Sequence, residues 1–128
     1  MTTLKIKKMR ENAILPQRAT PGSAGLDLCA CIDAPLLLPA RGHAVVPTGI
    51  AIELPEGTAG FVFARSGLGI KHGIALANGV GVIDSDYARS DNEGHIFMRM
   101  TNDNREGKSL IVPSGTAFAQ GIFLPFGI

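Results

Sequence analysis

Short apolar runs, each closed by glycine or proline, make up most of this chain. Residues 4–9 alternate apolar and basic side chains, which predicts a first strand with a polar outer face, and residues 95–103 alternate in the same way. Strands are also predicted at 26–32, 43–55, 59–64, 109–113 and 116–126, with two more inside 68–87. A single helical turn is expected near 65–73, where glycines work against a longer helix. Many short strands at regular spacing predict an all-β sandwich, jelly roll or barrel.

The composition fits one compact domain, which we expect to span residues 1–128. Sixteen glycines and eight prolines cut the chain into pieces too short for long helices. The formal net charge of +1 offers no basic field for nucleic acid and no polybasic patch for a membrane surface. Aromatic residues are 5% of the chain and tryptophan is absent, which disfavours stacking on single-stranded nucleic acid. We therefore expect neither nucleic acid nor membrane as a partner.

The two cysteines, Cys29 and Cys31, are interpreted as small apolar fillers. On a strand they would point to the same face, where a disulfide has poor geometry, and they supply only half of a zinc site. The first twelve residues carry charge but no apolar core of a signal peptide, and no apolar run reaches membrane-spanning length. We expect a cytoplasmic protein.

Two polar stretches could hold an anion or a metal. In "GSAGLDL", Asp27 enters a strand between two leucines, so its carboxylate faces water, a partner or a metal. In "ARSGLGIKHGI", the Arg65 guanidinium can hold phosphate oxygens, Ser66 offers a hydroxyl donor, and Gly67 lets backbone N–H groups approach an anion. The order differs from the nucleotide-binding P-loop. The alternative is an ordinary surface strand followed by a solvated loop.

Two further stretches could hold a planar ligand and a water. In "ANGVGVIDSDY", Asn78 can read a base edge, Gly81 permits close backbone approach, Asp84 ends a strand, and Tyr87 can stack on a sugar or base. A polar hairpin turn without function remains the alternative. Gln120 is a lone amide in an apolar strand, where it needs polar partners and could support a water.

Taken in this order, the stretches resemble the motifs of the trimeric all-β dUTP pyrophosphatase (dUTPase) family. The matching segments are "AGLDL", "RSGL" extended by "GIKHGI", "GVIDSDY" and a degenerate "GTAFAQ". The resemblance implies a distorted jelly-roll or barrel-like domain and a homotrimer with sites between subunits. It also implies Mg²⁺-dependent hydrolysis of dUTP to dUMP and pyrophosphate, by water attack at the α-phosphorus.

The resemblance also implies residue roles. Asp84 matches the carboxylate that activates the attacking water, and Tyr87 matches the aromatic that packs against deoxyribose. Asn78 and the backbone at Gly81 match the segment that reads uracil.

The phosphate side of the site is carried over in the same way. Arg65, Ser66 and Gly67 match the phosphate-contacting segment. Asp27 matches a carboxylate that helps order the Mg²⁺–triphosphate region through water. Gln120 matches the glutamine near the α-phosphate and the water.

The chain departs from the family pattern in three places. After Tyr87 it reads "ARSDNEGHI", several residues longer than usual, with His95 where glutamate is common. Thr116 and Ala117 stand where the family has an Asp-Arg pair. The glycine-rich fifth motif has no counterpart before the chain ends at "FLPFGI", so weakened catalysis is expected. The alternatives are a dUTPase-like nucleotide-binding or regulatory protein, and, ranked lower, a dCTP deaminase relative.

Overall fold

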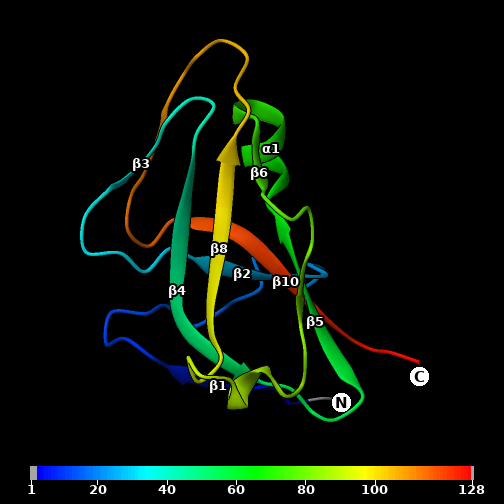
Figure 1. Ribbon diagram of the computed structural model, residues 1–128. Helices are drawn as coiled ribbons and strands as arrows, with labels where there is room; N and C mark the ends of the chain where they lie inside the picture. Colours follow the sequence, from blue (N-terminus) through cyan, green and yellow to red (C-terminus); the bar gives the residue numbers. More distant parts are fainter. Residues whose placement is uncertain (1–2, 128) are drawn as a thin grey trace.

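The computed structural model describes residues 3–127, and strands dominate it (Figure 1). The elements are, in chain order, β1 (Lys5–Lys8), β2 (Leu26–Cys29), β3 (Leu36–Leu38), β4 (His43–Glu53), β5 (Thr58–Ala64), α1 (Ser66–His72), β6 (Ile74–Leu76), β7 (Gly81–Ile83), the 3₁₀ turn η1 (Tyr87–Arg89), β8 (His95–Asn102), β9 (Leu110–Val112) and β10 (Ala117–Pro125). The all-β expectation is confirmed. Within the described residues, no helix has the length and apolar character needed to cross a membrane.

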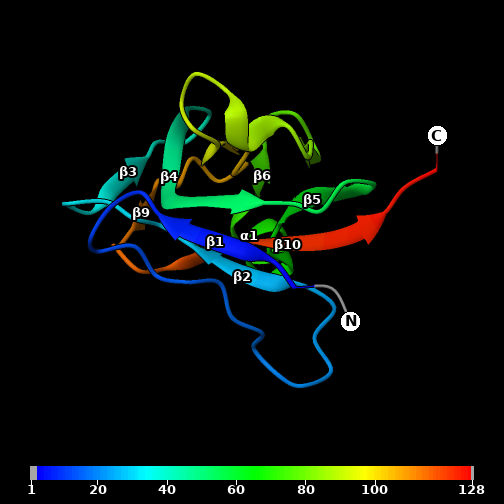
Figure 2. The same ribbon diagram turned by 90° about the horizontal axis from the view of Figure 1, so that it is seen from below.

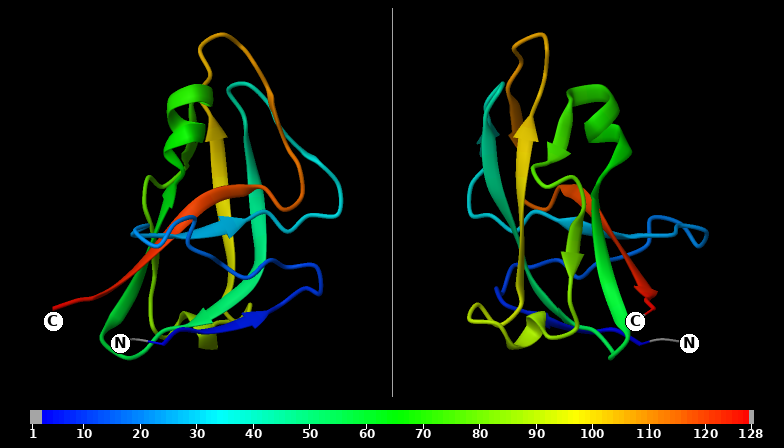
Figure 3. Two further views of the ribbon diagram at one scale, coloured as in Figure 1. Left: turned by 180° about the vertical axis from the view of Figure 1, so that it is seen from behind. Right: turned by 45° about the vertical axis from the view of Figure 1, so that its right-hand side comes forward.

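The strands form two four-stranded sheets and one small pair. The first sheet has the order β1-β4-β8-β6, the second has the order β2-β10-β5-β7, and β3 pairs with β9. All the strand pairs are antiparallel. In Figure 1, β4 and β8 run upright in front of β2 and β10, and the view from behind in Figure 3 shows the same crossing from the other side. This arrangement is jelly-roll-like.

Alternation along the strands explains where the core lies. On β8, Ile96, Met98 and Met100 are buried, whereas Phe97 and Arg99 between them are exposed. The second sheet meets this face with its own apolar side chains, which include Leu28, Val62, Ile83 and Phe118. Period-two patterning therefore placed one face of each sheet in a shared core.

Two elements differ from the sequence expectation. Helix α1 has seven residues rather than one turn, and Gly73 ends it in the left-handed conformation, donating its N–H to Leu68 and Gly69 carbonyls. The strand predicted over 26–32 ends at Cys29. The Cys31 N–H bonds the carbonyl of Pro47 on β4, so the chain crosses there to the other sheet. Both thiols are free, and Cys31 is fully buried.

Candidate active site

A cavity of about 430 Å³ opens between β7 and β8. Three of the site residues that the sequence suggested, Asn78, Gly81 and Tyr87, line this cavity. The complete lining is Val62, Ala77, Asn78, Gly81, Val82, Ile83, Tyr87, Ile96, Phe97, Met98 and Arg99. A cavity of this size and mixed lining falls in the range that holds small organic ligands.

The cavity exists because β6 and β7 belong to different sheets. β6 is the edge strand of the first sheet, beside β8, and β7 is the edge strand of the second sheet, beside β5. Figure 3 (right) shows β7 lying between β8 and β5. The sequence left open a polar hairpin turn within residues 77–87, and β6 and β7 do not pair with each other. Edge strands leave backbone N–H and C=O groups outside the ladder, so these groups remain available to a ligand.

Local hydrogen bonds shape the connection from β6 to β7. The Ala77 N–H bonds the Arg99 carbonyl at 2.9 Å, which holds the start of the connection against β8. The Gly79 N–H bonds the Leu76 carbonyl at 3.0 Å, and Gly79 has a φ of 75°. The side chain of Asn78 is left exposed at the turn. An amide in this position can both donate to and accept from a ligand.

Asp84 and Tyr87 are joined by a tight turn after β7. Asp84 directly follows the buried Ile83, its side chain is exposed, and its carbonyl accepts the Tyr87 N–H at 3.1 Å. The Tyr87 ring packs against the core, and its hydroxyl donates to the His95 carbonyl at 2.7 Å. The turn therefore fixes an exposed carboxylate next to an aromatic ring that lines the cavity.

A second group of polar side chains lies on the outer face of the second sheet. Gln120 on β10 is paired with Asp27 on β2 and with Phe63 on β5, so the three side chains project from one face. The Arg65 Nε lies 3.8 Å from the Asp27 Oδ1, with 41% and 26% of the two side chains exposed. Ser66 starts the adjacent helix α1 and is exposed. Arg65 and Asp27 are thus an ion pair that a ligand can reach.

Close packing holds Gln120 in this group. Gly25 is buried, and a Cβ built on it would lie 2.9 Å from the Gln120 Oε1 and 3.3 Å from the Gln120 Cβ. Only glycine fits beside the amide without moving it. The register of β10 shifts between Ala117 and Ala119, a β-bulge next to the site.

A neutral thiol borders the Asp27–Arg65 pair. Burial raises the pKa of Cys29, the charge of Asp27 raises it further, and the Arg65 guanidinium acts in the opposite direction. Cys29 is paired across the sheet with Ala117. The small Ala117, which stands where the family has the arginine of its Asp-Arg pair, therefore faces a protonated thiol.

The structure brings the sequence-suggested residues together in two groups rather than one. Asp27, Arg65, Ser66 and Gln120 do not line the cavity that holds Asn78, Gly81 and Tyr87. Gly67 is exposed within α1 beside Ser66. In the described part of the chain, no three His, Cys, Asp or Glu side chains cluster in a way that could hold a metal ion.

Sequence reasoning missed the wall of the cavity that β8 provides. Residues 96–99 of β8 line the cavity, together with Val62 of β5. The alternation of residues 96–99 indicated a core strand but not a ligand contact. The sequence marked His95 as a departure from the family pattern but did not indicate that its imidazole is buried, with Nε2 accepting the Gly49 N–H at 3.0 Å. Burial lowers the pKa of His95, and the nearby Arg10 lowers it further. No local pattern could have indicated these contacts, because their partners are far apart in the chain.

Comparisons with known proteins agree with the fold and with the family resemblance. The dUTPase family model matches residues 11–128. A deoxyuridine 5′-triphosphate nucleotidohydrolase of Desulfitobacterium hafniense (strain DSM 10664 / DCB-2) is 51% identical over 112 residues, which is 87% of this chain and 70% of that protein. The crystal structure of dUTPase from Streptococcus mutans has a TM-score of 0.85 and 32% identity, covering 99% of this chain and 98% of that chain. A dUTPase mutant from phage phi11 of S. aureus has a TM-score of 0.84, covering 99% of this chain and 93% of that chain; at 22% identity it shows the shared fold alone.

Proposed function

This chain belongs to the dUTPase family, and we propose on that basis that it hydrolyses dUTP to dUMP and pyrophosphate. The observation that carries the proposal is the cavity between the edge strand β7 and strand β8, with Tyr87 in its lining and Asp84 three residues earlier in the same turn. The arrangement supplies a slot for a planar base, an aromatic face for a sugar and a carboxylate for a water.

Uracil would be read mainly by backbone. The β7 edge and the connection at Asn78 offer N–H and C=O groups that can match the donor and acceptor positions of one base edge. Gly81 has no side chain, so the base can approach the strand. A base whose donors and acceptors are exchanged, such as cytosine, would leave buried groups unpaired, and that is a strong source of selectivity.

Asp84 would act as the general base. The water oxygen attacks the α-phosphorus while one water proton passes to the Asp84 carboxylate. The bond from the α-phosphorus to the bridging oxygen breaks, and pyrophosphate leaves in line with the attack. We assign Gln120 to the same step, where its amide would orient the water and the α-phosphate.

The triphosphate would lie on the second group of residues. The Arg65 guanidinium, the Ser66 hydroxyl and the Gly67 backbone N–H are donors of the kind that holds phosphate oxygens. Asp27 would hold a Mg²⁺ ion through water, because this cation takes most of its ligands from phosphates and water and needs only one or two carboxylates. When bound, the ion neutralises charge that develops on the phosphate oxygens.

We propose a homotrimer whose sites lie between subunits, so that the cavity of one copy faces the Arg65 group of another. The division of the site residues into two groups supports this arrangement. The outer face of the second sheet also exposes apolar side chains that a neighbouring copy could cover, with Val82 at 61% and Leu124 at 49% exposure. Residues 126–127 continue away from the molecule after β10 (Figure 2), and Phe126 among them is 46% exposed. A cytoplasmic location and the lack of a nucleic-acid or membrane partner stay predictions.

Pyrophosphate release tests the chemistry. We expect release from dUTP with Mg²⁺ and little from dCTP, dTTP or UTP. The Asp84→Asn variant should lose about 100- to 10,000-fold in kcat, which is the usual contribution of a general base. Asp86→Asn is the matched control, because Asp86 is an exposed carboxylate in the same turn whose side chain makes no cap hydrogen bond. Equal rates for the wild type and Asp84→Asn would refute the assigned role.

Mixing inactive variants tests the arrangement between copies. Asp84→Asn and Arg65→Ala are each expected to be inactive alone. In mixed assemblies, some sites would combine a wild-type Asp84 from one copy with a wild-type Arg65 from another, so activity should return after co-refolding. Activity that stays at the sum of the two variants would indicate that each site is built within one chain.

A further inference from the structure

The loop of residues 88–94, which connects Tyr87 to β8, is closed by its own hydrogen bonds. The Asn92 Oδ1 accepts from the Ser90 hydroxyl at 2.7 Å and from the Gly94 N–H at 3.2 Å. The Ser90 carbonyl accepts the Glu93 N–H at 2.9 Å. The loop, although it departs from the family pattern, is therefore a compact structure with Asn92 at its centre.

The backbone of this loop leaves little space for another conformation. Glu93 and Gly94 both have positive φ, at 59° and 82°. A Cβ on Gly94 would lie 2.7 Å from the Ala88 Cα, so the two ends of the loop are in close contact. Such geometry holds Asn92 in one place relative to the 3₁₀ turn that begins at Tyr87.

Asn92 uses its donors on the residues that flank the loop. Its Nδ2 donates to the Tyr87 hydroxyl at 3.0 Å and to the His95 carbonyl at 3.3 Å. The Tyr87 hydroxyl itself donates to the same carbonyl at 2.7 Å. The proton of the Tyr87 hydroxyl is therefore used in a hydrogen bond within the protein, and the hydroxyl end of the Tyr87 ring is held by two hydrogen bonds.

Tyr87 lines the cavity, so a residue that holds its hydroxyl also sets the position of its ring at the ligand. The wall of a pocket excludes the 2′-hydroxyl of ribose only if the wall cannot move away from that hydroxyl. A tyrosine whose hydroxyl is hydrogen-bonded moves less than one held only by its backbone. The Tyr87 hydroxyl has two such bonds, one to the His95 carbonyl and one from Asn92.

We propose that Asn92 is a positioning residue that acts through Tyr87 and sets the discrimination between deoxyribose and ribose. The inference rests on the proposed function, because it takes Tyr87 to be the residue that faces the sugar. Asn92 touches no substrate. Its hydrogen bond to the Tyr87 hydroxyl adds to the bond that the hydroxyl makes with the His95 carbonyl, and this addition raises the selectivity of the site for 2′-deoxynucleotides.

Two substitutions separate positioning from loop stability. Asn92→Asp keeps an oxygen that can accept from Ser90 and Gly94 but removes the Nδ2 donor to Tyr87. Asn92→Ala removes both. We expect both variants to lower the dUTP-to-UTP ratio of kcat/KM by about three- to tenfold, the effect of one neutral hydrogen bond. The change should fall on the KM for dUTP and on UTP turnover, while kcat for dUTP stays near the wild-type value.

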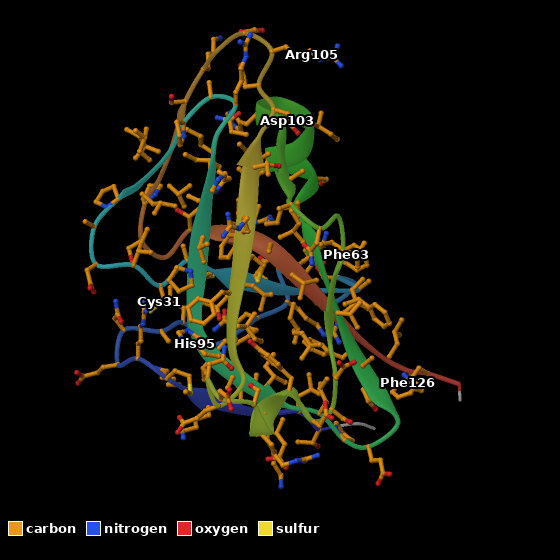
Figure 4. All side chains as sticks on the ribbon, viewed as in Figure 1. Cys31, Phe63, His95, Asp103, Arg105 and Phe126 are labelled. Atoms are coloured by element: carbon orange, nitrogen blue, oxygen red, sulfur yellow. The ribbon has the colours of Figure 1, made fainter. Side chains whose placement is uncertain are left out.

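Further variants test the route through Tyr87. Tyr87→Phe should lower the ratio by a similar factor, and Asn92→Ala should add nothing further in the Tyr87→Phe background. The matched control is Asn104→Ala. Asn104 also closes a loop, through its Oδ1 and the N–H groups of Glu106 and Lys108, but it lies past the other end of β8. Figure 4 labels His95 near one end of β8 and Asp103 near the other.

Binding measurements keep the test independent of turnover. The same variants are titrated with dUMP and UMP by calorimetry, with circular dichroism to confirm that each is folded. A wild-type preference for dUMP that falls in Asn92→Ala and Asn92→Asp but not in Asn104→Ala supports the inference. An unchanged preference in folded Asn92 variants overturns it while the proposed function stands. A wild type that releases no pyrophosphate refutes the proposed function, and one that also binds dUMP and UMP equally overturns both.

Discussion

The stability of this protein should fall as the pH is lowered from neutral toward 5, and His95 should be the cause. His95 is 8% exposed, and its Nε2 accepts the N–H of Gly49, which is itself buried. This hydrogen bond requires an unprotonated Nε2, so the folded state holds the neutral ring. Burial and the charge of Arg10 lower the pKa of His95 below its ordinary value of 6.5.

The direction of the pH effect follows from that shift. A histidine with a lowered pKa in the folded state binds its proton more readily in the unfolded chain. Its contribution is complete above pH 6.5 and is lost as the pH falls from 6.5 toward the folded pKa. Between the two pKa values, the free energy of unfolding should drop by about 1.4 kcal/mol per pH unit, the value for one proton.

Two variants isolate the residue. His95→Gln cannot take up a proton and can still offer an oxygen to Gly49, so the loss of stability below pH 6.5 should disappear. His95→Phe leaves the Gly49 N–H without a partner and should cost about 1–3 kcal/mol at pH 7.5. His72→Gln, at an exposed position on α1, is the matched control and should behave as the wild type.

Urea denaturation followed by circular dichroism measures the effect at pH 7.5, 6.5, 5.5 and 5.0. The protein concentration is held constant, because assembly of copies would add a concentration-dependent contribution. If the free energies of the wild type and His95→Gln fall in parallel over this range, a different group titrates and the assignment to His95 is wrong.

Two further predictions concern packing at and behind the site. Gly25→Ala would place a Cβ against Gln120 and displace its amide, so kcat for dUTP should fall roughly 10- to 100-fold with little change in Tm. Gly22→Ala is the control, because no atom lies within 4 Å of the added Cβ, and it should leave kcat unchanged. Equal effects of the two substitutions on kcat would contradict the packing argument. Asn102→Ala removes a fully buried amide whose Nδ2 donates to the Leu38 carbonyl at 3.1 Å. Urea titrations should show that the substitution lowers the free energy of unfolding by about 1–3 kcal/mol. A loss below about 0.5 kcal/mol would show that water replaces the amide.

The sequence carried much of the fold because strand patterning is local. Alternating side chains over 95–103 correctly indicated β8 and its buried face, and the glycine and proline breaks separated the strands. The family motifs pointed to Asn78, Gly81 and Tyr87, and these positions do line one cavity. The length of α1 was underestimated, because the low helix propensity of glycine is only a weak predictor of where a helix forms. The helix ends at Gly73, whose left-handed conformation is a property of the backbone geometry.

Tertiary structure decided what depends on partners distant in the chain. The sequence left open a polar hairpin turn within residues 77–87, yet β6 and β7 joined different sheets, and the cavity lies beside β7. The register of β10 placed Gln120 beside Asp27, and folding brought His95 to the N–H of Gly49, 46 residues earlier. Alternation specifies which face of a strand is apolar, but the choice of neighbouring strand and register comes from the packing of the whole core. The motifs therefore named the candidate residues of the site, and the assignment of strands to sheets determined how these residues are grouped.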